Sequence, residues 1–290
     1  MTRPTLALVL GGGGSRGLAH IGVLEVLQRE HIPIDRIVAT SMGGIVGVLF
    51  ALGLPPDQIA QWTRRAMVMV EPQPYALRNV RLLSSRARQQ WLRKQFTHLL
   101  EEQTFADLRI PVTLMTVNML DGTEVPLTTG PLVPALLATT AVPGLFPPVP
   151  FGDMQLADGG VIDSLATHVA VEQGADKIIA VDVYPALTTD RPWSNPVSAI
   201  MGFQLPLALF SGADALQGPN MFSSMWRSVR VMTWHLHQKR LADDPPDILL
   251  RPRVDTYGSL DFKDMDGPLQ AGVEAAEERL ADIKALCGER

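Results

Sequence analysis

The chain has 290 residues, 46% of them hydrophobic, which is ample for a large core and close to the upper size of one α/β domain. Its 25 basic and 30 acidic residues give a net charge of −5, without a run of Lys and Arg dense enough to follow a phosphate backbone, so we expect no nucleic-acid partner. The one cysteine, Cys287, cannot form an internal disulfide, and an oxidising compartment is therefore not indicated.

The N-terminal region predicts a buried strand and not a signal peptide. Residues 5–10 form a short apolar run that stops at four glycines. No stretch of about 18 uninterrupted apolar residues occurs, so the sequence predicts no transmembrane helix. We expect one domain over residues 1–290 in a cytoplasmic protein, with peripheral contact at the inner membrane face left open.

Strands and helices alternate at the start of the chain. The strand over 5–10 is followed by apolar residues at helical spacing, namely Leu18, Ile21, Leu24 and Leu27. A second short strand is expected over 37–39 and a second helix over 42–52. This β-α-β-α order predicts an α/β fold in which crossover helices join parallel strands.

The rest of the chain contains further elements of both kinds. We expect helices over 55–67, 84–96 and 132–140, and strands over 112–118, 124–127, 177–182 and 248–250. Residues 196–240 look less regular and are rich in Met, Phe and Trp, which favours either core packing or a lid or tunnel that contacts lipid. A C-terminal helix over about 267–287 is indicated by the apolar stripe Leu269, Val273, Ala276, Leu280, Ile283 and Cys287.

The glycine-rich turn after the first strand has two interpretations. Gly12, Gly14 and Gly17 have the spacing of a dinucleotide-binding fingerprint, and Asp35 stands near the distance expected for a ribose contact. An oxyanion, however, needs the same backbone N–H groups as a phosphate does. The turn alone therefore leaves a nucleotide site and an oxyanion hole both open.

Ser41 is the candidate nucleophile. It lies between a short strand and an apolar helix, in the kind of sharp turn that exposes a serine hydroxyl at the edge of a sheet. An ordinary helix N-cap is the alternative, because serine is common there. The position of Ser41 one β-α unit after the glycine turn favours a nucleophile beside an oxyanion hole formed by Gly12, Gly13 and Gly14.

Asp158 is the candidate base. A serine hydroxyl needs a positioned base, and Asp158 precedes Gly159 and Gly160, which give a tight and uncrowded turn. A plain Asp-Gly turn is the alternative. His20 and His168 are also considered, since a Ser-His-Asp triad is a common arrangement, but their positions on expected helices do not require a catalytic role.

Four motifs in order resemble the patatin-like phospholipase family, and most closely its small bacterial members. They are GGGGSRG at residues 11–17, TSMGG at 40–44, AVPGLFPP at 141–148 and DGGV at 158–161. The resemblance implies a three-layer α/β fold with a mostly parallel central sheet flanked by helices. It also implies a Ser41–Asp158 dyad that cleaves fatty acyl esters of lipids, as a phospholipase A or lysophospholipase, without a metal or other cofactor.

The glycines of the elbow and the turn, Gly43, Gly159 and Gly160, belong to the same motifs. Arg16, beside the glycine turn, is expected to orient the loop or attract a lipid phosphate, with a surface ion pair as the alternative. The expected partner is a lipid or acyl-ester substrate, and the oligomeric state is not indicated. Two other functions remain open: a nucleotide-binding oxidoreductase and a non-catalytic lipid-binding protein.

Overall fold

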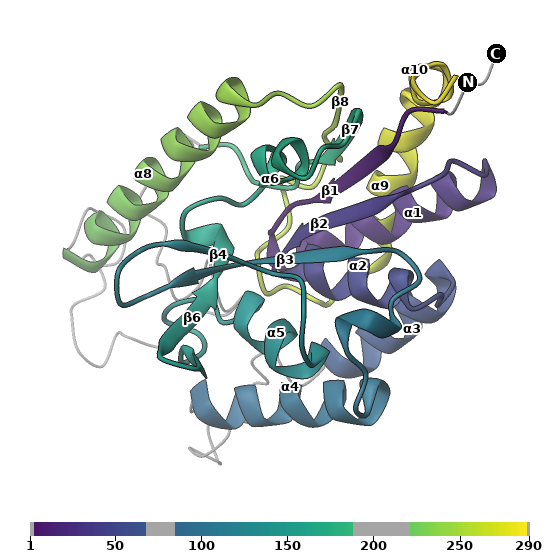
Figure 1. Cartoon of the computed structure of the whole chain (residues 1–290). Coiled ribbons are helices and arrows are strands. Elements are labelled where there is room, and N and C mark those ends of the chain that lie inside the picture. Colours follow the sequence, from purple (N-terminus) through teal and green to yellow (C-terminus); the bar gives the residue numbers. More distant parts are fainter. Residues whose placement is uncertain (1–2, 68–84, 188–220, 289–290) are drawn as a thin grey trace.

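The computed structural model describes residues 3–67, 85–187 and 221–288. One mixed sheet lies at the centre of this part of the chain, with the strand order β5-β6-β3-β2-β1-β7-β8 and with β4 paired to β3 (Figure 1). Its strands are β1 (Leu6–Leu10), β2 (Arg36–Thr40), β3 (Val112–Asn118), β4 (Glu124–Leu127), β5 (Val149–Phe151), β6 (Met154–Asp158), β7 (Lys177–Val181) and β8 (Ile248–Leu250). The neighbours β3, β2, β1, β7 and β8 run parallel, as the β-α-β-α order predicted.

Helices cover both faces of the sheet and make three layers. On one face lie α1 (Ala19–Arg29), α2 (Met42–Ala51), α3 (Pro56–Met67), α4 (Ser85–Leu100), α5 (Leu132–Thr139), α9 (Asp266–Glu278) and α10 (Leu280–Leu286). On the other face lie α6 (Thr167–Glu172) and the C-terminal end of α8 (Met221–Asp243). Residues of β1 alternate between the two cores, Leu8 facing the first and Val9 the second. The predicted α/β fold, with a mostly parallel sheet flanked by helices, is confirmed.

Two glycines let α9 lie directly on α1. A Cβ atom on Gly22 of α1 would overlap the carbonyl oxygen of Leu269, and one on Gly272 of α9 would overlap that of Ala19. Small residues at both contact points therefore bring the two backbones together.

The C-terminal region is helical, as expected, but it is not one helix. The backbone N–H of Arg279 bonds to the carbonyl of Ala276, three residues back, and this tighter turn separates α9 from α10. The predicted apolar stripe still faces the core, with Ala276 and Ile283 fully buried.

Two further expectations differ from the structure. Residues 221–243 form the single helix α8, so the prediction of an irregular segment is wrong there; this stretch contains neither Pro nor Gly. Residues 196–220 lie outside the described part of the chain. The hairpin of β5 and β6 was not expected, because a proline-rich run precedes it and leaves Gly152-Asp153 as its only turn signal.

None of the helices within the described ranges is long and apolar enough to cross a membrane.

Candidate active site

Strand β3 brings the two candidate catalytic residues together. Its residue Met115 pairs with Thr40, the last residue of β2, and its next residue, Thr116, pairs with Asp158, the last residue of β6. Since β4 occupies the opposite edge of β3, the ends of β2 and β6 meet on one edge. Ser41 directly follows Thr40 and so lies beside Asp158, although 117 positions separate them in the chain (158 minus 41).

Ser41 has a strained backbone and a hydroxyl that is not used as a helix cap. Its φ of 55° and ψ of −121° lie in a region that residues other than glycine rarely adopt. Its side chain makes no capping bond to α2, and it lies close enough to Asp158 to lower the pKa of that carboxyl. Its backbone N–H donates to the Thr139 hydroxyl at 3.0 Å, and that hydroxyl donates to the Met115 carbonyl at 2.7 Å. Thr139 thus fixes the turn, a role that the sequence did not indicate.

Asp158 is a buried carboxylate with a raised pKa. Only 5% of the residue is exposed, and burial raises its pKa from 3.8 to about 6, although the nearby Ser41 side chain and the hydrogen bond from the Gly160 backbone act in the opposite direction. The Gly160 N–H donates to Oδ1 at 2.8 Å and fixes the carboxylate. Asp158 therefore remains ionised at neutral pH and is a stronger base than an exposed aspartate.

The glycine loop lies next to Ser41, and its amides differ in availability. The Gly12 N–H donates to the Ser164 carbonyl at 2.9 Å, and the Ser164 hydroxyl donates to the Gly12 carbonyl at 3.0 Å. The N–H of Gly12 is thus already used. Within the described residues, the N–H groups of Gly13 and Gly14 have no acceptor, and Gly14 has the left-handed φ of 62° that glycine favours.

A segment from the far end of the chain holds this loop. The Ser15 N–H donates to the Ser259 carbonyl at 2.8 Å, and the Ser15 hydroxyl donates to the Gly258 carbonyl at 2.6 Å. A Cβ atom on Gly14 would overlap the Ser259 carbonyl. No pattern in the sequence indicated this clamp of residues 258–259 on the loop, because it depends on a contact between residues more than 240 positions apart.

Arg16 contacts the same C-terminal segment, at Ser259. Its Nη1 donates to the Ser259 hydroxyl at 3.0 Å, only 9% of the residue is exposed, and burial lowers its pKa to about 10. Of the expected roles for Arg16, these contacts favour orientation of the loop over a surface ion pair.

The buried His20 side chain holds the start of the glycine loop in place. Its Nε2 donates to the carbonyl of Gly11 at 2.7 Å, and complete burial lowers its pKa to about 4, so the ring is neutral. The Nε2 proton is therefore committed to the backbone and not to Ser41.

Asp35 does not lie where a ribose contact would require it. It precedes β2, accepts the N–H of Leu6 at 2.7 Å and pairs with Arg3. Leu6 begins β1, whereas the glycine loop follows its end at Leu10. The carboxylate and the loop thus lie at opposite ends of the strand, which leaves the dinucleotide interpretation without its acidic partner.

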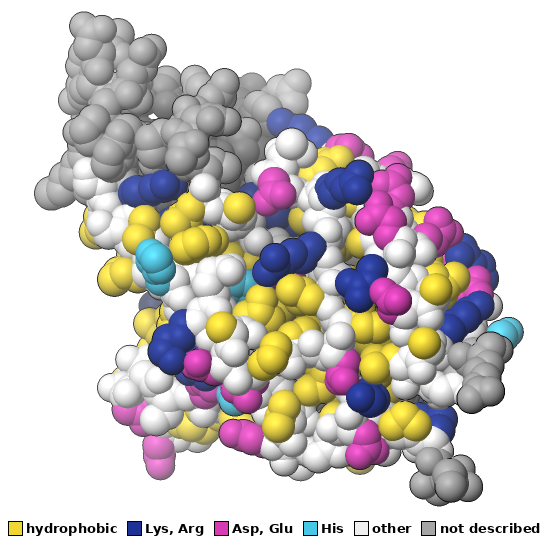
Figure 2. All heavy atoms as spheres, turned by 90° about the horizontal axis from the view of Figure 1, so that it is seen from above, with side chains coloured by type: hydrophobic (Ala, Val, Ile, Leu, Met, Phe, Trp, Pro, Cys, Tyr) yellow, Lys and Arg dark blue, Asp and Glu magenta, His cyan; other side chains and the backbone are white. Residues whose placement is uncertain are grey.

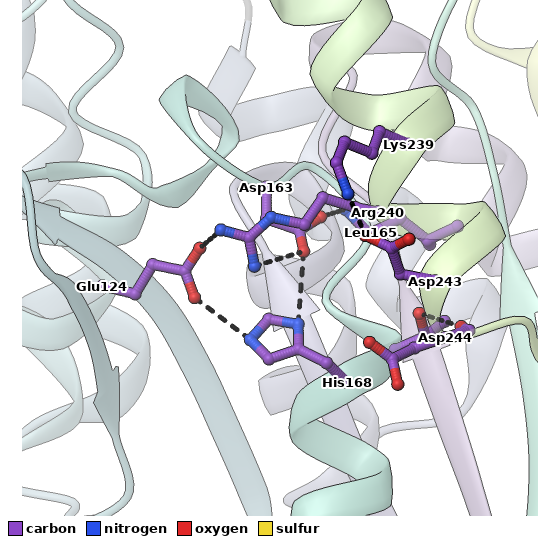
Figure 3. Close-up of polar contacts among 9 residues, drawn as sticks. Glu124, Asp163, Leu165, His168, Lys239, Arg240, Asp243 and Asp244 are labelled. Atoms are coloured by element: carbon purple, nitrogen blue, oxygen red, sulfur yellow. Dashed lines mark hydrogen bonds and ion pairs between the residues drawn. The ribbon is translucent and has the colours of Figure 1, made fainter.

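His168 belongs to a separate ion-pair network (Figure 3). Its Nε2 lies 3.0 Å from Glu124 and its Nδ1 lies 3.3 Å from Asp163, while Arg240 of α8 lies 2.6 Å from Glu124 and 3.9 Å from Asp163. Glu124, Asp163 and His168 are also the described residues grouped closely enough to hold a metal ion. Here the negative charges of Glu124 and Asp163 face two cationic side chains, those of His168 and Arg240. The charges of the group are therefore balanced by its own side chains.

We expect this network to stabilise the protein in a pH-dependent way. Hydrogen bonds to Asp163 and Glu124 raise the pKa of His168 to about 9, above its value of 6.5 in an unfolded chain. The stabilisation is then complete below pH 6.5 and is lost as the pH rises to 9. His168→Gln should therefore cost on the order of 1 kcal/mol at pH 6, allowing for solvent screening, and much less at pH 9. Urea unfolding of both proteins across this range measures the difference; a cost independent of pH would contradict the assignment.

The fold is of the α/β class, and Ser41 occupies a strained turn between the strand β2 and the helix α2. The chain belongs to the patatin-like phospholipase family, whose model, "Patatin-like phospholipase", matches residues 8–171. The resemblance seen in its motifs is thereby confirmed.

Known relatives agree with this family. Lysophospholipase NTE1 of Debaryomyces hansenii is 28% identical over 296 residues, which cover 97% of this chain and 18% of that protein. An uncharacterized NTE family protein of Mycobacterium tuberculosis is 27% identical over 280 residues, 95% of this chain and 46% of the relative. The chain thus spans less than half the length of either relative.

A solved structure agrees with the fold. VipD from Legionella pneumophila superposes with a TM-score of 0.51 at 13% identity, over 97% of this chain and 67% of that one.

Proposed function

We propose that this chain is a serine acyl hydrolase of the phospholipase A or lysophospholipase type, which cleaves fatty acyl esters of lipids through Ser41 and Asp158. The observation that carries the proposal is the strained turn that places Ser41 beside the buried carboxylate of Asp158, whose pKa is raised. The family and the lysophospholipase relatives support the class of substrate.

In the first half of the reaction, Asp158 accepts the Ser41 proton while Oγ attacks the ester carbonyl carbon. The carbonyl oxygen becomes an oxyanion, for which the free N–H groups of Gly13 and Gly14 are the proposed donors. Loss of one such donor costs about 3–4 kcal/mol in a protease, so the loop contributes on the same scale as the base. Departure of the alcohol, protonated by Asp158, leaves an acyl group on Ser41.

In the second half, water replaces the alcohol. Asp158 accepts a proton from this water, the hydroxide attacks the acyl carbon, and the carboxylate returns the proton to Ser41 as the fatty acid leaves. One carboxylate serves in both halves because its position is fixed by the Gly160 N–H and its pKa lies near 6. The chain supplies all of these groups itself.

Labelling with a fluorophosphonate tests the nucleophile. We expect stoichiometric labelling of the wild type and none of Ser41→Ala, because only an activated hydroxyl attacks phosphorus at a useful rate. Ser228→Ala, at an exposed serine of α8, is the matched control and should label fully. Release of fatty acid from phospholipids and lysophospholipids, measured on the same proteins, then defines the substrate class.

Two results would assign a different function. Vesicle binding without labelling or fatty-acid release would indicate a non-catalytic lipid-binding protein. Labelling that persists in Ser41→Ala would place the nucleophile at another residue.

A further inference from the structure

Ser164 joins the glycine loop through two hydrogen bonds that run in opposite directions. The Gly12 N–H donates to the Ser164 carbonyl at 2.9 Å, and the Ser164 hydroxyl donates to the Gly12 carbonyl at 3.0 Å. Ser164 is 4% exposed, and a Cβ atom on Gly12 would lie 3.3 Å from both the Ser164 oxygen Oγ and the Ser41 carbon Cβ. Ser164 therefore contacts the loop at the glycine that also lies against the proposed nucleophile.

The Ser164 hydroxyl holds a peptide group whose other half is a proposed oxyanion donor. The Gly12 carbonyl and the Gly13 N–H belong to one trans peptide, in which they point in opposite directions. A hydrogen bond that holds the carbonyl therefore also sets the direction of the N–H. Among the described residues the Gly13 N–H has no acceptor, so it is available to a substrate oxygen.

Backbone preference alone does not set the orientation of this peptide. It lies between two glycines, which lack a Cβ atom and adopt a wide range of φ and ψ values. Rotation of the peptide would turn the Gly13 N–H away and bring the Gly12 carbonyl, which repels an oxyanion, into its place. The preceding peptide is held separately, because its Gly11 carbonyl accepts from His20 at 2.7 Å. The Ser164 hydroxyl is thus the side-chain contact that selects one orientation of the Gly12–Gly13 peptide.

The surface charge of the molecule does not replace correctly directed backbone donors. Figure 2 shows acidic and basic side chains interspersed with hydrophobic ones on the face seen from above, so this face has no field of one sign that would attract an anion. An oxyanion is stabilised best by donors that already point at it before the reaction begins. The rate of hydrolysis should therefore depend on the direction of the Gly13 N–H.

The segment that ends at Ser164 also carries the proposed base. Asp158 lies six positions before Ser164 (164 minus 158). Between them, the Asp163 N–H donates to the Gly159 carbonyl at 2.9 Å, and the Asp163 carboxylate accepts the N–H of Leu165 at 2.9 Å. The base and the hydroxyl that holds the loop are thus parts of one internally bonded segment.

We propose that Ser164 is a positioning residue for ester hydrolysis, whose hydroxyl holds the Gly12 carbonyl so that the Gly13 N–H stays directed at the oxyanion. This role rests on the proposed function, because it lies within the reaction of Ser41 and Asp158. Ser164 acts through the Gly12–Gly13 peptide and not by contact with the substrate. Its effect should therefore appear in the transition state, where the oxyanion exists, and not in substrate binding.

Ser164→Ala removes only the hydroxyl and tests this role in hydrolysis of a p-nitrophenyl ester. Complete loss of an oxyanion donor lowers kcat about a hundred- to thousandfold, so we expect misdirection of this donor to lower kcat about ten- to hundredfold. KM should stay nearly constant, since the ground-state ester makes little use of the donor. Ser164→Thr, which keeps a hydroxyl, should recover most of the lost kcat. A normal kcat in Ser164→Ala, or a rise in KM alone, overturns the proposal.

Thr167→Val is the matched control. The Thr167 hydroxyl donates to the Asp244 carbonyl at 2.6 Å and the residue is 1% exposed, so this change also takes one buried hydroxyl from one backbone carbonyl. Thr167 begins α6, and its hydroxyl bonds to the residue after α8 and not to the glycine loop. Both variants should lose similar thermal stability, but Thr167→Val should keep the wild-type kcat. Equal losses of kcat in both variants assign the effect to general loosening of this region and overturn the proposal.

Two further measurements separate an effect on the loop from an effect on the base. An alkyl trifluoromethyl ketone forms a hemiketal oxyanion on an active serine, so its inhibition constant should rise in Ser164→Ala by about the factor lost from kcat. The inhibition constant of the corresponding alcohol should not change. The pH midpoint of kcat/KM should also stay at its wild-type value, because Asp158 is unaltered. A shifted midpoint with an unchanged ketone constant places the effect at Asp158 and overturns the proposal.

Crystal structures of the wild type and Ser164→Ala separate this role from the proposed function. In the variant, we expect the Gly12–Gly13 peptide to rotate or to adopt two orientations. A wild type that hydrolyses no ester contradicts the proposed function, but a rotated peptide in the variant would still support the hold of Ser164 on the loop. An unrotated peptide in that case contradicts both. An active wild type with an equally active Ser164→Ala contradicts the role of Ser164 alone.

Discussion

Asp158→Asn should lower ester hydrolysis by about a thousandfold or more and at the same time stabilise the protein at pH 8. Activity falls because an amide cannot accept the Ser41 proton, and a positioned base contributes about a hundred- to ten-thousandfold to such reactions. Stability rises because the buried carboxylate of Asp158 is charged at pH 8, and among the described residues no cationic side chain forms an ion pair with it.

The sign of the stability effect follows from the pKa of Asp158. Its value of about 6 in the folded protein exceeds the ordinary 3.8, so between these values the native state binds more protons than the unfolded state. The free energy of unfolding therefore decreases as the pH rises through this window. The two-unit difference corresponds to about 2–3 kcal/mol, and Asn removes this cost while its Oδ1 can still accept the Gly160 N–H.

Chemical unfolding of wild type and Asp158→Asn at pH 4 and pH 8 measures the effect. The variant should be the more stable protein at pH 8, and this advantage should be absent at pH 4, where the wild-type carboxyl group is protonated. In the wild type, kcat/KM should decrease as the pH falls below about 6. An Asp158→Asn protein with normal activity would transfer the role of base to another group.

Gly43→Ala should destabilise the protein by about 3 kcal/mol or more and abolish its activity. A Cβ atom on Gly43 would overlap the carbonyl oxygen of Leu10 and come within 2.8 Å of its carbonyl carbon and 2.9 Å of the Gly11 oxygen. These are backbone atoms at the end of β1, which cannot move aside as a flexible side chain would. Relief of the overlap must shift α2, and with it the strained turn at Ser41, away from the glycine loop.

Gly47→Ala, one turn further along α2, is the matched control. Its Cβ atom would lie 3.0 Å from a methyl group of Ile37, a side chain that can adjust, and alanine gains about 1 kcal/mol over glycine in a helix interior. We expect Gly47→Ala to lie within about 1 kcal/mol of the wild type in thermal unfolding and to retain ester hydrolysis. Similar losses in both variants would show that helix packing in general, and not the Leu10 contact, limits this turn.

The features that depend on local conformation could be predicted from the amino-acid pattern. The apolar runs ended by glycine predicted β1 and β2, and helical spacing predicted α1 and α2, because such patterns require only the backbone preferences of neighbouring residues. The position of Ser41 between a strand and a helix was predicted in the same way. The motifs also indicated the family, which the match over residues 8–171 confirms.

The way in which these parts meet could not be predicted, because it depends on the folded chain as a whole. Which edge of β3 receives β6, and hence that Asp158 lies beside Ser41, depends on pairing between distant strands that no local pattern specifies. Two further contacts join remote segments in the same way. The Gly12 N–H donates to the Ser164 carbonyl, and Ser259 accepts hydrogen bonds from Ser15 and Arg16 beside the glycine loop. Such contacts form when hydrophobic burial packs the whole chain, so their partners are fixed by the complete fold and not by neighbouring residues.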